Sequence, residues 1–169
     1  MDSAELRAMQ APIKERYKTA PQAAVITLKA KGTIDSESLS CKVETGRALA
    51  VAGLHPATGG SGLELCSGDM LLEALVACAG VTLKSVATAV EVPLRVGNVF
   101  AEGDLDFRGT LGVDKEAPVG FREIRLRFDV GTDAPQDKLD LLLKLTERYC
   151  VVYQTIKNGP KVSVSMVRV

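Results

Sequence analysis

Four cysteines are the residues of this chain best suited to chemistry: Cys41, Cys66, Cys78 and Cys150. Ionised thiols act as nucleophiles, as metal ligands and as redox groups. No two of them have the close spacing of a zinc site or of a Cys-x-x-Cys motif. The first 17 residues carry no pattern of a secretory signal, so we expect the chain in the reducing cytoplasm, where structural disulfides are rare. Each thiol is therefore expected to be free, and its role depends on its surroundings.

Two of these cysteines have contexts that favour packing over catalysis. Cys41 alternates with polar residues in the segment 38–44, which is typical of the apolar face of a strand. We interpret it as a small buried hydrophobe. Cys66 stands directly before Ser67, the predicted N-cap of a helix, and is a candidate for an accessory thiol only.

The other two cysteines lie in predicted helices. Cys78 stands in the middle of a long apolar helix, and this context alone indicates core packing, because burial raises the pKa of a thiol and makes it inert. Cys150 begins a short predicted helix at 150–157, where exposed N–H groups and the positive end of the helix dipole favour its thiolate. The residues alone leave Cys150 open between a helix-cap residue and a functional thiol.

The elements that must position these thiols follow from the apolar periodicity. The segment 3–18 has helical spacing, but Pro12 interrupts it, so we expect a short or kinked helix. The Gly-rich segment 53–68 is predicted to be a loop. Asp133 and Gln136 resemble a capping box at the start of a further helix. Alternating patterns predict strands at about 26–31, 38–44, 99–108, 123–130 and 162–166, and helical patterns predict helices at 69–90, 133–149 and 150–157.

The predicted helix at 69–90 is apolar on all its faces, so it needs burial on every side. Such a helix fits beneath a wrapping sheet or against a partner subunit, and we favour both together. Strands with one apolar and one polar face predict an antiparallel sheet. The order of elements is that of an α+β fold, and we expect a single domain over residues 1–169 with residues 1–20 as an N-terminal helical extension.

Two motifs resemble those of the OsmC/Ohr family, the proteins of organic hydroperoxide resistance. Ser-Gly-Asp-Met-Leu-Leu-Glu-Ala-Leu-Val-Ala-Cys-Ala-Gly at 67–80 resembles the helix that carries the first cysteine of that family. Arg-Tyr-Cys-Val-Val-Tyr-Gln-Thr-Ile at 148–156 resembles its second motif, with Val151 in place of a common proline. The resemblance extends over nearly all of the chain after about Ala23. It implies an OsmC-like fold in which an antiparallel sheet wraps around two central helices, in an intertwined homodimer.

The same resemblance implies a mechanism. Cys78 attacks the O–O bond of an organic hydroperoxide, releases an alcohol and becomes a sulfenic acid, which Cys150 traps as a disulfide. A small dithiol reductant, such as a lipoyl group, then reduces that disulfide. Family members place an arginine and a glutamate near the first cysteine, and the candidates for these roles are Arg47, with Asp69 as a shorter substitute or Glu73. The residues alone allow equally that Arg47 and Glu73 are ordinary surface or interface charges.

The remaining residues argue against several other classes of function. Equal numbers of basic and acidic residues, 21 of each, leave no electrostatic footprint for a nucleic acid or a membrane surface. The longest apolar stretch contains Glu73 and is followed by Lys84, so no membrane span is expected. His55, the sole histidine, lacks a set of neighbouring ligands, so we expect a structural role in its loop and neither a metal nor a cofactor.

Two alternatives to a peroxidase stay open. The first is a non-catalytic OsmC-like protein that binds a small hydrophobic ligand. The second is a purely structural pair of cysteines in another kind of enzyme.

Overall fold

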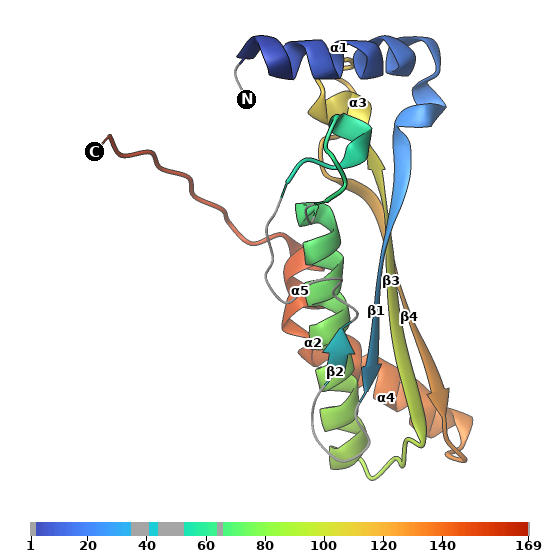
Figure 1. Ribbon diagram of the computed structural model, residues 1–169. Helices are drawn as coiled ribbons and strands as arrows, with labels where there is room; N and C mark the ends of the chain where they lie inside the picture. Colours follow the sequence, from blue (N-terminus) through green and yellow to red (C-terminus); the bar gives the residue numbers. More distant parts are fainter. Residues whose placement is uncertain (1–2, 35–40, 44–52, 64–65, 169) are drawn as a thin grey trace.

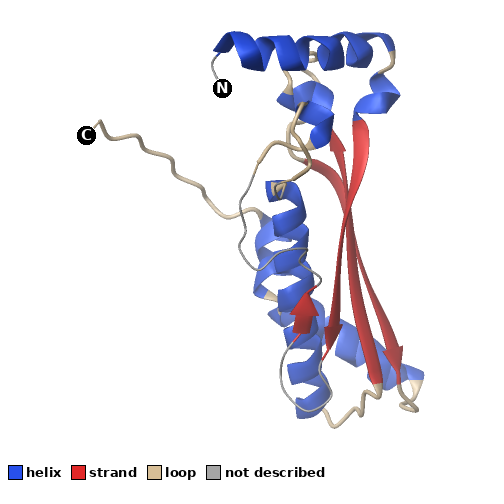
Figure 2. Ribbon diagram, viewed as in Figure 1, coloured by secondary structure: helices blue, strands red, loops and turns tan. Residues whose placement is uncertain are grey.

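The computed structural model describes residues 3–34, 41–43, 53–63 and 66–168. A long helix lies along one antiparallel sheet, and a second long helix crosses one end of the molecule (Figure 1). The elements, drawn by type in Figure 2, are α1 (Ser3–Thr19), the 3-10 turn η1 (Pro21–Ala24), β1 (Val25–Ile34), β2 (Cys41–Val43), the 3-10 turn η2 (Pro56–Thr58), α2 (Ser67–Ala89), β3 (Val96–Asp106), α3 (Phe107–Thr110), β4 (Phe121–Gly131), α4 (Gln136–Tyr149) and α5 (Val151–Asn158).

The four strands form a sheet in the order β2-β1-β3-β4, and all neighbouring strands are antiparallel. On the face toward α2, Val99 and Ala101 of β3 are fully buried. The other face carries ion pairs, among them Arg125 of β4 with Asp104 of β3 at 2.7 Å. One dry and one wet face explain the alternation in the sequence, and the predicted α+β class with an antiparallel sheet is confirmed.

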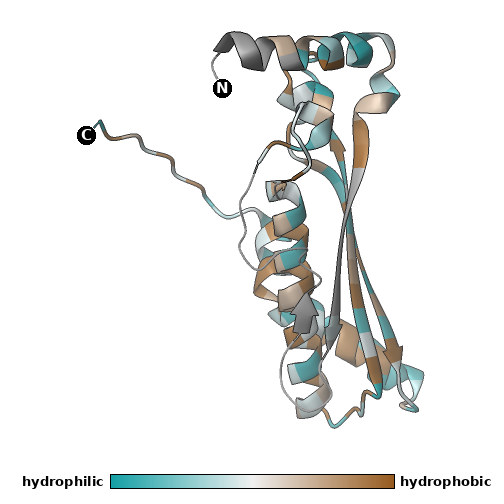
Figure 3. Ribbon diagram, viewed as in Figure 1, coloured by the Kyte–Doolittle hydropathy of each residue, from teal (hydrophilic) through white to brown (hydrophobic). Residues whose placement is uncertain are grey.

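Helix α2 supplies most of the central core. It packs against β1, β3, α4 and α5. Figure 3 shows hydrophobic residues, in brown, at intervals along the helix. Its buried side includes Leu72, Leu75, Val76 and Ala79, whereas Leu71 and Val81 are 40% and 37% exposed. Within one chain the sheet and the two C-terminal helices cover only part of the helix, so the burial expected on its remaining side is left to a partner subunit. By length and hydropathy α2 is the one described helix able to cross a membrane, but here it packs as a core helix.

Helix α1 runs past Pro12 to Thr19, so of the two predicted alternatives, a short helix and a kinked one, the structure excludes the short one. Its second half is anchored by Tyr17, which is fully buried and donates a hydrogen bond of 2.7 Å to the carbonyl of Ala57. A buried aromatic with a satisfied hydroxyl offsets the local cost of a proline inside a helix. The helix thereby holds the η2 turn that precedes α2.

Three details differ from the expectations at element ends. Helix α4 has Pro135 as its N-cap with no side-chain cap, because Asp133 instead forms an ion pair with Arg95. Helix α2 has Cys66 as its N-cap, so Ser67 is its first residue and not the cap. The segment 160–168, which contains the strand expected at about 162–166, is an exposed extended chain that projects from the body (Figure 1), since no described strand runs beside it.

Candidate active site

Helix α2 and the start of α5 bring together two cysteines that are 72 residues apart in the chain. Cys78 is half-buried on α2, and Cys150, between α4 and α5, is only 1% exposed. Both pack in one apolar cluster, and the thiol of Cys150 is in hydrogen-bond contact with the sulfur of Cys78. Residues from two separate parts of the chain therefore form one dithiol site.

Helix α5 begins at this site because Cys150 caps it. The Cys150 Sγ atom accepts a hydrogen bond from the backbone N–H of Tyr153 at 3.5 Å, and the Cys150 carbonyl accepts from Gln154 at 2.9 Å. The first N–H groups of a helix have no partner within it. Those of Val151 and Val152 favour the ionised form of Cys78. The amino end of α5 thus supplies uncharged donors, with the positive end of a helix dipole, to the Cys78 sulfur.

These contacts favour ionisation of Cys78. Burial by itself raises the pKa of this thiol, but the N–H groups of Val152 and Val151, the Cys150 thiol and the Thr82 hydroxyl outweigh burial and bring the pKa below its ordinary value of 9.0. Thr82 lies one helical turn after Cys78, on the same face of α2. The sequence-based reasoning missed this residue, although a hydroxyl four positions after a cysteine on an apolar helix is a detectable signal.

Cys150 is affected in the opposite direction. Burial raises the pKa of its thiol to about 11, and the hydrogen bond with Cys78 and the charge of the Cys78 thiolate add to this effect. The N–H groups of Tyr153 and Val152 at the helix start do favour the thiolate of Cys150, as expected, but burial and the neighbouring Cys78 outweigh them. Of the two thiols, Cys78 is therefore the more easily ionised, and Cys150 the more strongly protonated.

The acidic residues proposed as helpers lie elsewhere on α2. Asp69 and Glu73 precede Cys78 by nine and five residues, which places them roughly 13 and 7 Å away along the helix axis. Neither is among the groups that act on the Cys78 thiol. Burial raises the pKa of both carboxyl groups, with His55 opposing the rise at Asp69 and the charge of Asp69 adding to it at Glu73. Arg47 lies outside the described residues.

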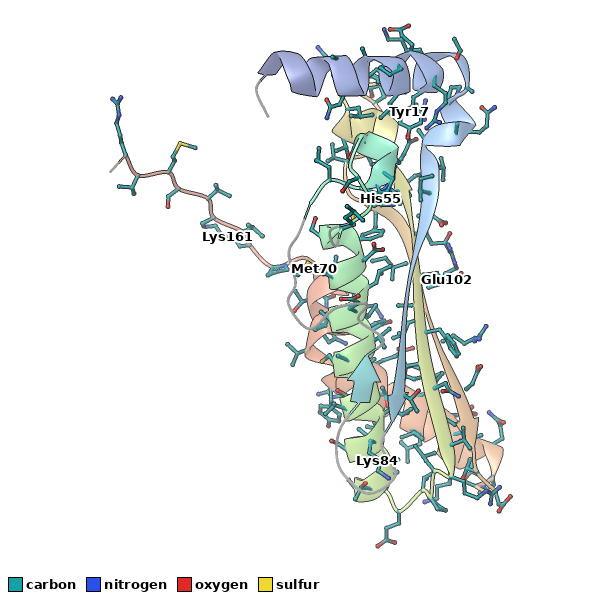
Figure 4. All side chains as sticks on the ribbon, in the orientation of Figure 1. Tyr17, His55, Met70, Lys84, Glu102 and Lys161 are labelled. Atoms are coloured by element: carbon teal, nitrogen blue, oxygen red, sulfur yellow. The ribbon has the colours of Figure 1, made fainter. Side chains whose placement is uncertain are left out.

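His55 has a structural role in the turn before α2. Its Nδ1 atom accepts a hydrogen bond of 3.0 Å from the N–H of Ala57, and its ring stacks on Phe107 with centroids 4.9 Å apart. Figure 4 places it between Tyr17 of α1 and Met70 in the first turn of α2. Burial lowers the pKa of His55, and the nearby Asp69 carboxylate partly opposes this shift. Within the described residues, no three His, Cys, Asp or Glu side chains are arranged to hold a metal ion.

Of the remaining cysteines, Cys66 is half-buried at the N-cap of α2, twelve residues before Cys78, and Cys41 lies in β2.

A groove of about 720 Å³ is lined by residues of α2, β4, α4 and α5, and neither Cys78 nor Cys150 is among those lining residues. Its wall shares Leu75, Tyr153 and Ile156 with the cluster that contains Cys78 and Cys150. Other apolar residues complete its lining, and four charged residues also border it. The other apolar lining residues are Leu71, Phe121, Ile124, Leu126, Phe128 and Leu143, and the charged ones are Arg122, Glu123, Glu147 and Lys157.

Comparison with known proteins agrees with this fold. The chain aligns over 82% of its length with the crystal structure of an OsmC-like hydroperoxide resistance protein from Jannaschia sp. CCS1, with a TM-score of 0.60, 12% identity and 91% of that chain covered. It aligns over 80% of its length with an OsmC-like protein from Mycoplasma pneumoniae, with a TM-score of 0.55, 14% identity and 86% of that chain covered. Among curated proteins, no sequence matches. A family profile described as OsmC-like protein matches residues 59–165, the part that carries both thiols, and the chain therefore belongs to the OsmC-like family.

Proposed function

We propose that this protein is a thiol peroxidase that reduces organic hydroperoxides at Cys78. The observation that carries the proposal is the dithiol site, where one sulfur is surrounded by hydrogen-bond donors and the second sulfur is in contact with the first. A thiolate beside a protonated thiol is what a two-step peroxidase needs, because the second thiol traps the oxidised first one before over-oxidation. The fold neighbour named for hydroperoxide resistance supports the same reaction class.

The reaction balances with the groups of the site and two outside reactants. The Cys78 thiolate attacks one oxygen of the hydroperoxide, an S–O bond forms as the O–O bond breaks, and the alkoxide leaves as an alcohol after taking up a proton. The sulfur of Cys150, once deprotonated, attacks the sulfenic sulfur of Cys78, so that an S–S bond forms and water leaves. A dithiol reductant then reduces this disulfide by thiol–disulfide exchange; the reductant becomes a disulfide, and both protein thiols are restored.

Apolar groove residues support an organic rather than an inorganic peroxide as the substrate. An alkyl group in the groove would bury its own surface and that of Leu75, Tyr153 and Ile156. Each Å² of apolar surface removed from water contributes about 25 cal/mol to the free energy of binding. Hydrogen peroxide has no such group. The activating groups in this proposal are the donors at α5, because Asp69 and Glu73 do not act on the Cys78 thiol and Arg47 lies outside the described residues.

We also propose that the working unit is a homodimer. Leu71 and Val81 of α2 and Leu141 and Leu143 of α4 are each 37–46% exposed, and two of them line the groove. A second copy against these residues would bury the open side of α2, which its sequence demands. Light scattering on the intact protein should give twice the chain mass. The variant Val81→Glu should give the mass of a monomer. Val119→Glu, at an exposed site on the loop before β4, should keep the mass of a dimer. A monomer mass for the unaltered protein would refute this proposal.

One experiment tests the peroxidase directly. Reduced protein is mixed with one equivalent of cumene hydroperoxide, the lost thiols are counted and the disulfides are mapped by mass spectrometry. The expected product is a Cys78–Cys150 disulfide. Cys78→Ser should abolish fast peroxide consumption. In Cys150→Ser the reaction should stop at the sulfenic acid of Cys78, which dimedone traps. Cys66→Ser is the matched control and should behave as the unaltered protein does.

The groove also favours a second candidate, a protein that binds a small hydrophobic ligand without turnover. In that case oxidation would be slow and spread over all four cysteines, while an apolar fluorescent probe would bind equally well to the Cys78→Ser variant.

A further inference from the structure

Ala57 joins His55 to helix α1. Its N–H donates a hydrogen bond of 3.0 Å to Nδ1 of His55, and its carbonyl accepts one of 2.7 Å from the hydroxyl of Tyr17. Gln10 of α1 adds a longer hydrogen bond of 3.5 Å from its Nε2 atom to the carbonyl of Thr58. Figure 4 shows Tyr17 and His55 at the end of the molecule that α1 crosses. The η2 turn, which His55 caps, is therefore the part of the body that holds α1 by hydrogen bonds.

The hydrogen bond at His55 exists only while its imidazole is neutral. A backbone N–H is always a donor, so Nδ1 is the ring nitrogen that carries no proton. A proton taken up by the ring goes to that nitrogen, which then becomes a donor and loses its bond to the N–H of Ala57. The ring also stacks on Phe107, which is buried, so the positive charge would lie in partly apolar surroundings.

We propose that His55 is an acid-sensitive latch: its neutral ring keeps the η2 turn in the form that binds α1, and protonation of Nδ1 releases this helix from the body. Release takes Tyr17 out of the apolar cluster that it shares with Phe107 and Leu111. The latch acts on the N-terminal helix and is independent of the proposed peroxidase reaction.

Asp69 is the charged group, among the described residues, that shifts the ionisation of His55. Its carboxylate, in the first turn of α2, favours the protonated ring, whereas burial disfavours it more strongly and lowers the pKa of His55 below 6.5. The other charged groups on the surrounding elements are Lys14, Glu15, Arg16 and Lys18 of α1, Asp106 and Arg108 at α3, and Asp114, Lys115 and Glu116 in the loop after α3. Because folding lowers the pKa of His55, its contribution to holding α1 is complete above about pH 7 and is lost as the pH falls through the pKa of the folded state.

Hydrogen–deuterium exchange of the intact protein tests the latch. Peptides from α1 and from α4 are followed by mass spectrometry at about pH 7.5 and about pH 5.5, one unit on either side of the ordinary pKa of histidine, with labelling times scaled for the effect of pH on intrinsic exchange. His55→Asn keeps an oxygen that can accept the N–H of Ala57 but does not titrate, and His55→Ala removes the acceptor. His55 is the sole histidine, so proton NMR reads its titration from a single imidazole.

In the unaltered protein, the protection of α1 should fall several-fold between the two pH values. The limit is roughly tenfold, because an unfolded imidazole at one pH unit below its pKa is about ten times more protonated than neutral. Helix α4 should keep its protection. His55→Asn should hold α1 equally at both pH values, and His55→Ala should hold it less firmly at both. In Asp69→Asn, which removes the charge that favours protonation, the pKa of His55 should be lower than in the unaltered protein.

Two results would overturn the proposal. One is a protection of α1 in the unaltered protein that does not change between the two pH values. The other is an equal fall in His55→Asn, which would assign the effect to carboxyl groups. If His55→Asn does not hold α1 at the higher pH, His55→Ser, with another side chain common at helix N-caps, replaces it in the same comparison.

Discussion

Oxidation of the dithiol should stabilise the fold by an amount that can be worked out from the chain. A Cys78–Cys150 disulfide closes a loop of about 72 residues, and chain-entropy arguments give about 4 kcal/mol of stabilisation for a loop of that size. Distortion of the folded state reduces such gains when the two sulfurs must be pulled together. Here the two thiols are already in hydrogen-bond contact, so we expect most of the 4 kcal/mol to be observed.

The assay is urea unfolding of the reduced protein and of protein treated with one equivalent of cumene hydroperoxide, followed by circular dichroism. The free energies of unfolding are compared rather than the midpoints alone, because a cross-linked unfolded chain exposes less surface and has a smaller m-value. Treated Cys150→Ser is the control and should show no gain, and dithiothreitol should remove the gain from the unaltered protein. A gain below about 1 kcal/mol, with the disulfide verified by mass spectrometry, would refute the reasoning that the folded site accepts the bond without strain.

Three further predictions concern the thiol pair and two buried polar groups. Cys78→Ala removes the neighbouring anion, so the pKa of Cys150 should fall below about 11, as measured by the pH dependence of its alkylation; a rise would contradict the proposed coupling. The Asp106 carboxylate is buried and its pKa lies below 3.8 because an arginine side chain hydrogen-bonds to it, so Asp106→Asn should lower the free energy of unfolding by about 3 kcal/mol, against less than about 0.5 kcal/mol for the exposed Asp129→Asn. Because folding lowers this pKa, the stabilising contribution of Asp106 is complete above about pH 4 and is lost as the pH falls through the pKa of the folded state. The free energies of unfolding of Asp106→Asn and Asp129→Asn should therefore converge in acid. Tyr17→Phe leaves a buried carbonyl without its donor and should cost about 1–2 kcal/mol in thermal unfolding, and an unchanged Tm would show that α1 is not anchored there.

Much of the fold could be predicted from the sequence because its elements have clear periodicity. The alternation at Ile124, Leu126, Phe128 and Val130 places β4 within two residues of its observed ends. The long apolar run predicts α2 equally well. The tail at 162–166 has the same alternation as a strand but no neighbouring strand in the described chain, so pattern alone predicted an element that the fold does not form.

The site was less accessible to such reasoning, because its chemistry depends on contacts between distant segments. Local context indicated an inert Cys78 and an ionised Cys150, whereas the contacts lower the pKa of Cys78 and burial raises that of Cys150. The N–H groups at the start of α5 act on both sulfurs, but only at Cys78 do they, together with the other donors, outweigh burial. Thr82 was missed for a related reason, since its role depends on which side of α2 the second thiol approaches.

In the proposed peroxidase mechanism, the same contacts would give the two sulfurs an order of action. While Cys78 is a thiolate, its charge and its hydrogen bond add to the burial that keeps Cys150 protonated, so the second thiol cannot compete for peroxide. Conversion of Cys78 to a sulfenic acid removes that negative charge. Two of the causes that raise the pKa of Cys150 then disappear, whereas the N–H of Tyr153 still stabilises its thiolate. In that mechanism, oxidation of the first sulfur makes the second easier to ionise, so the disulfide forms after the peroxide has reacted.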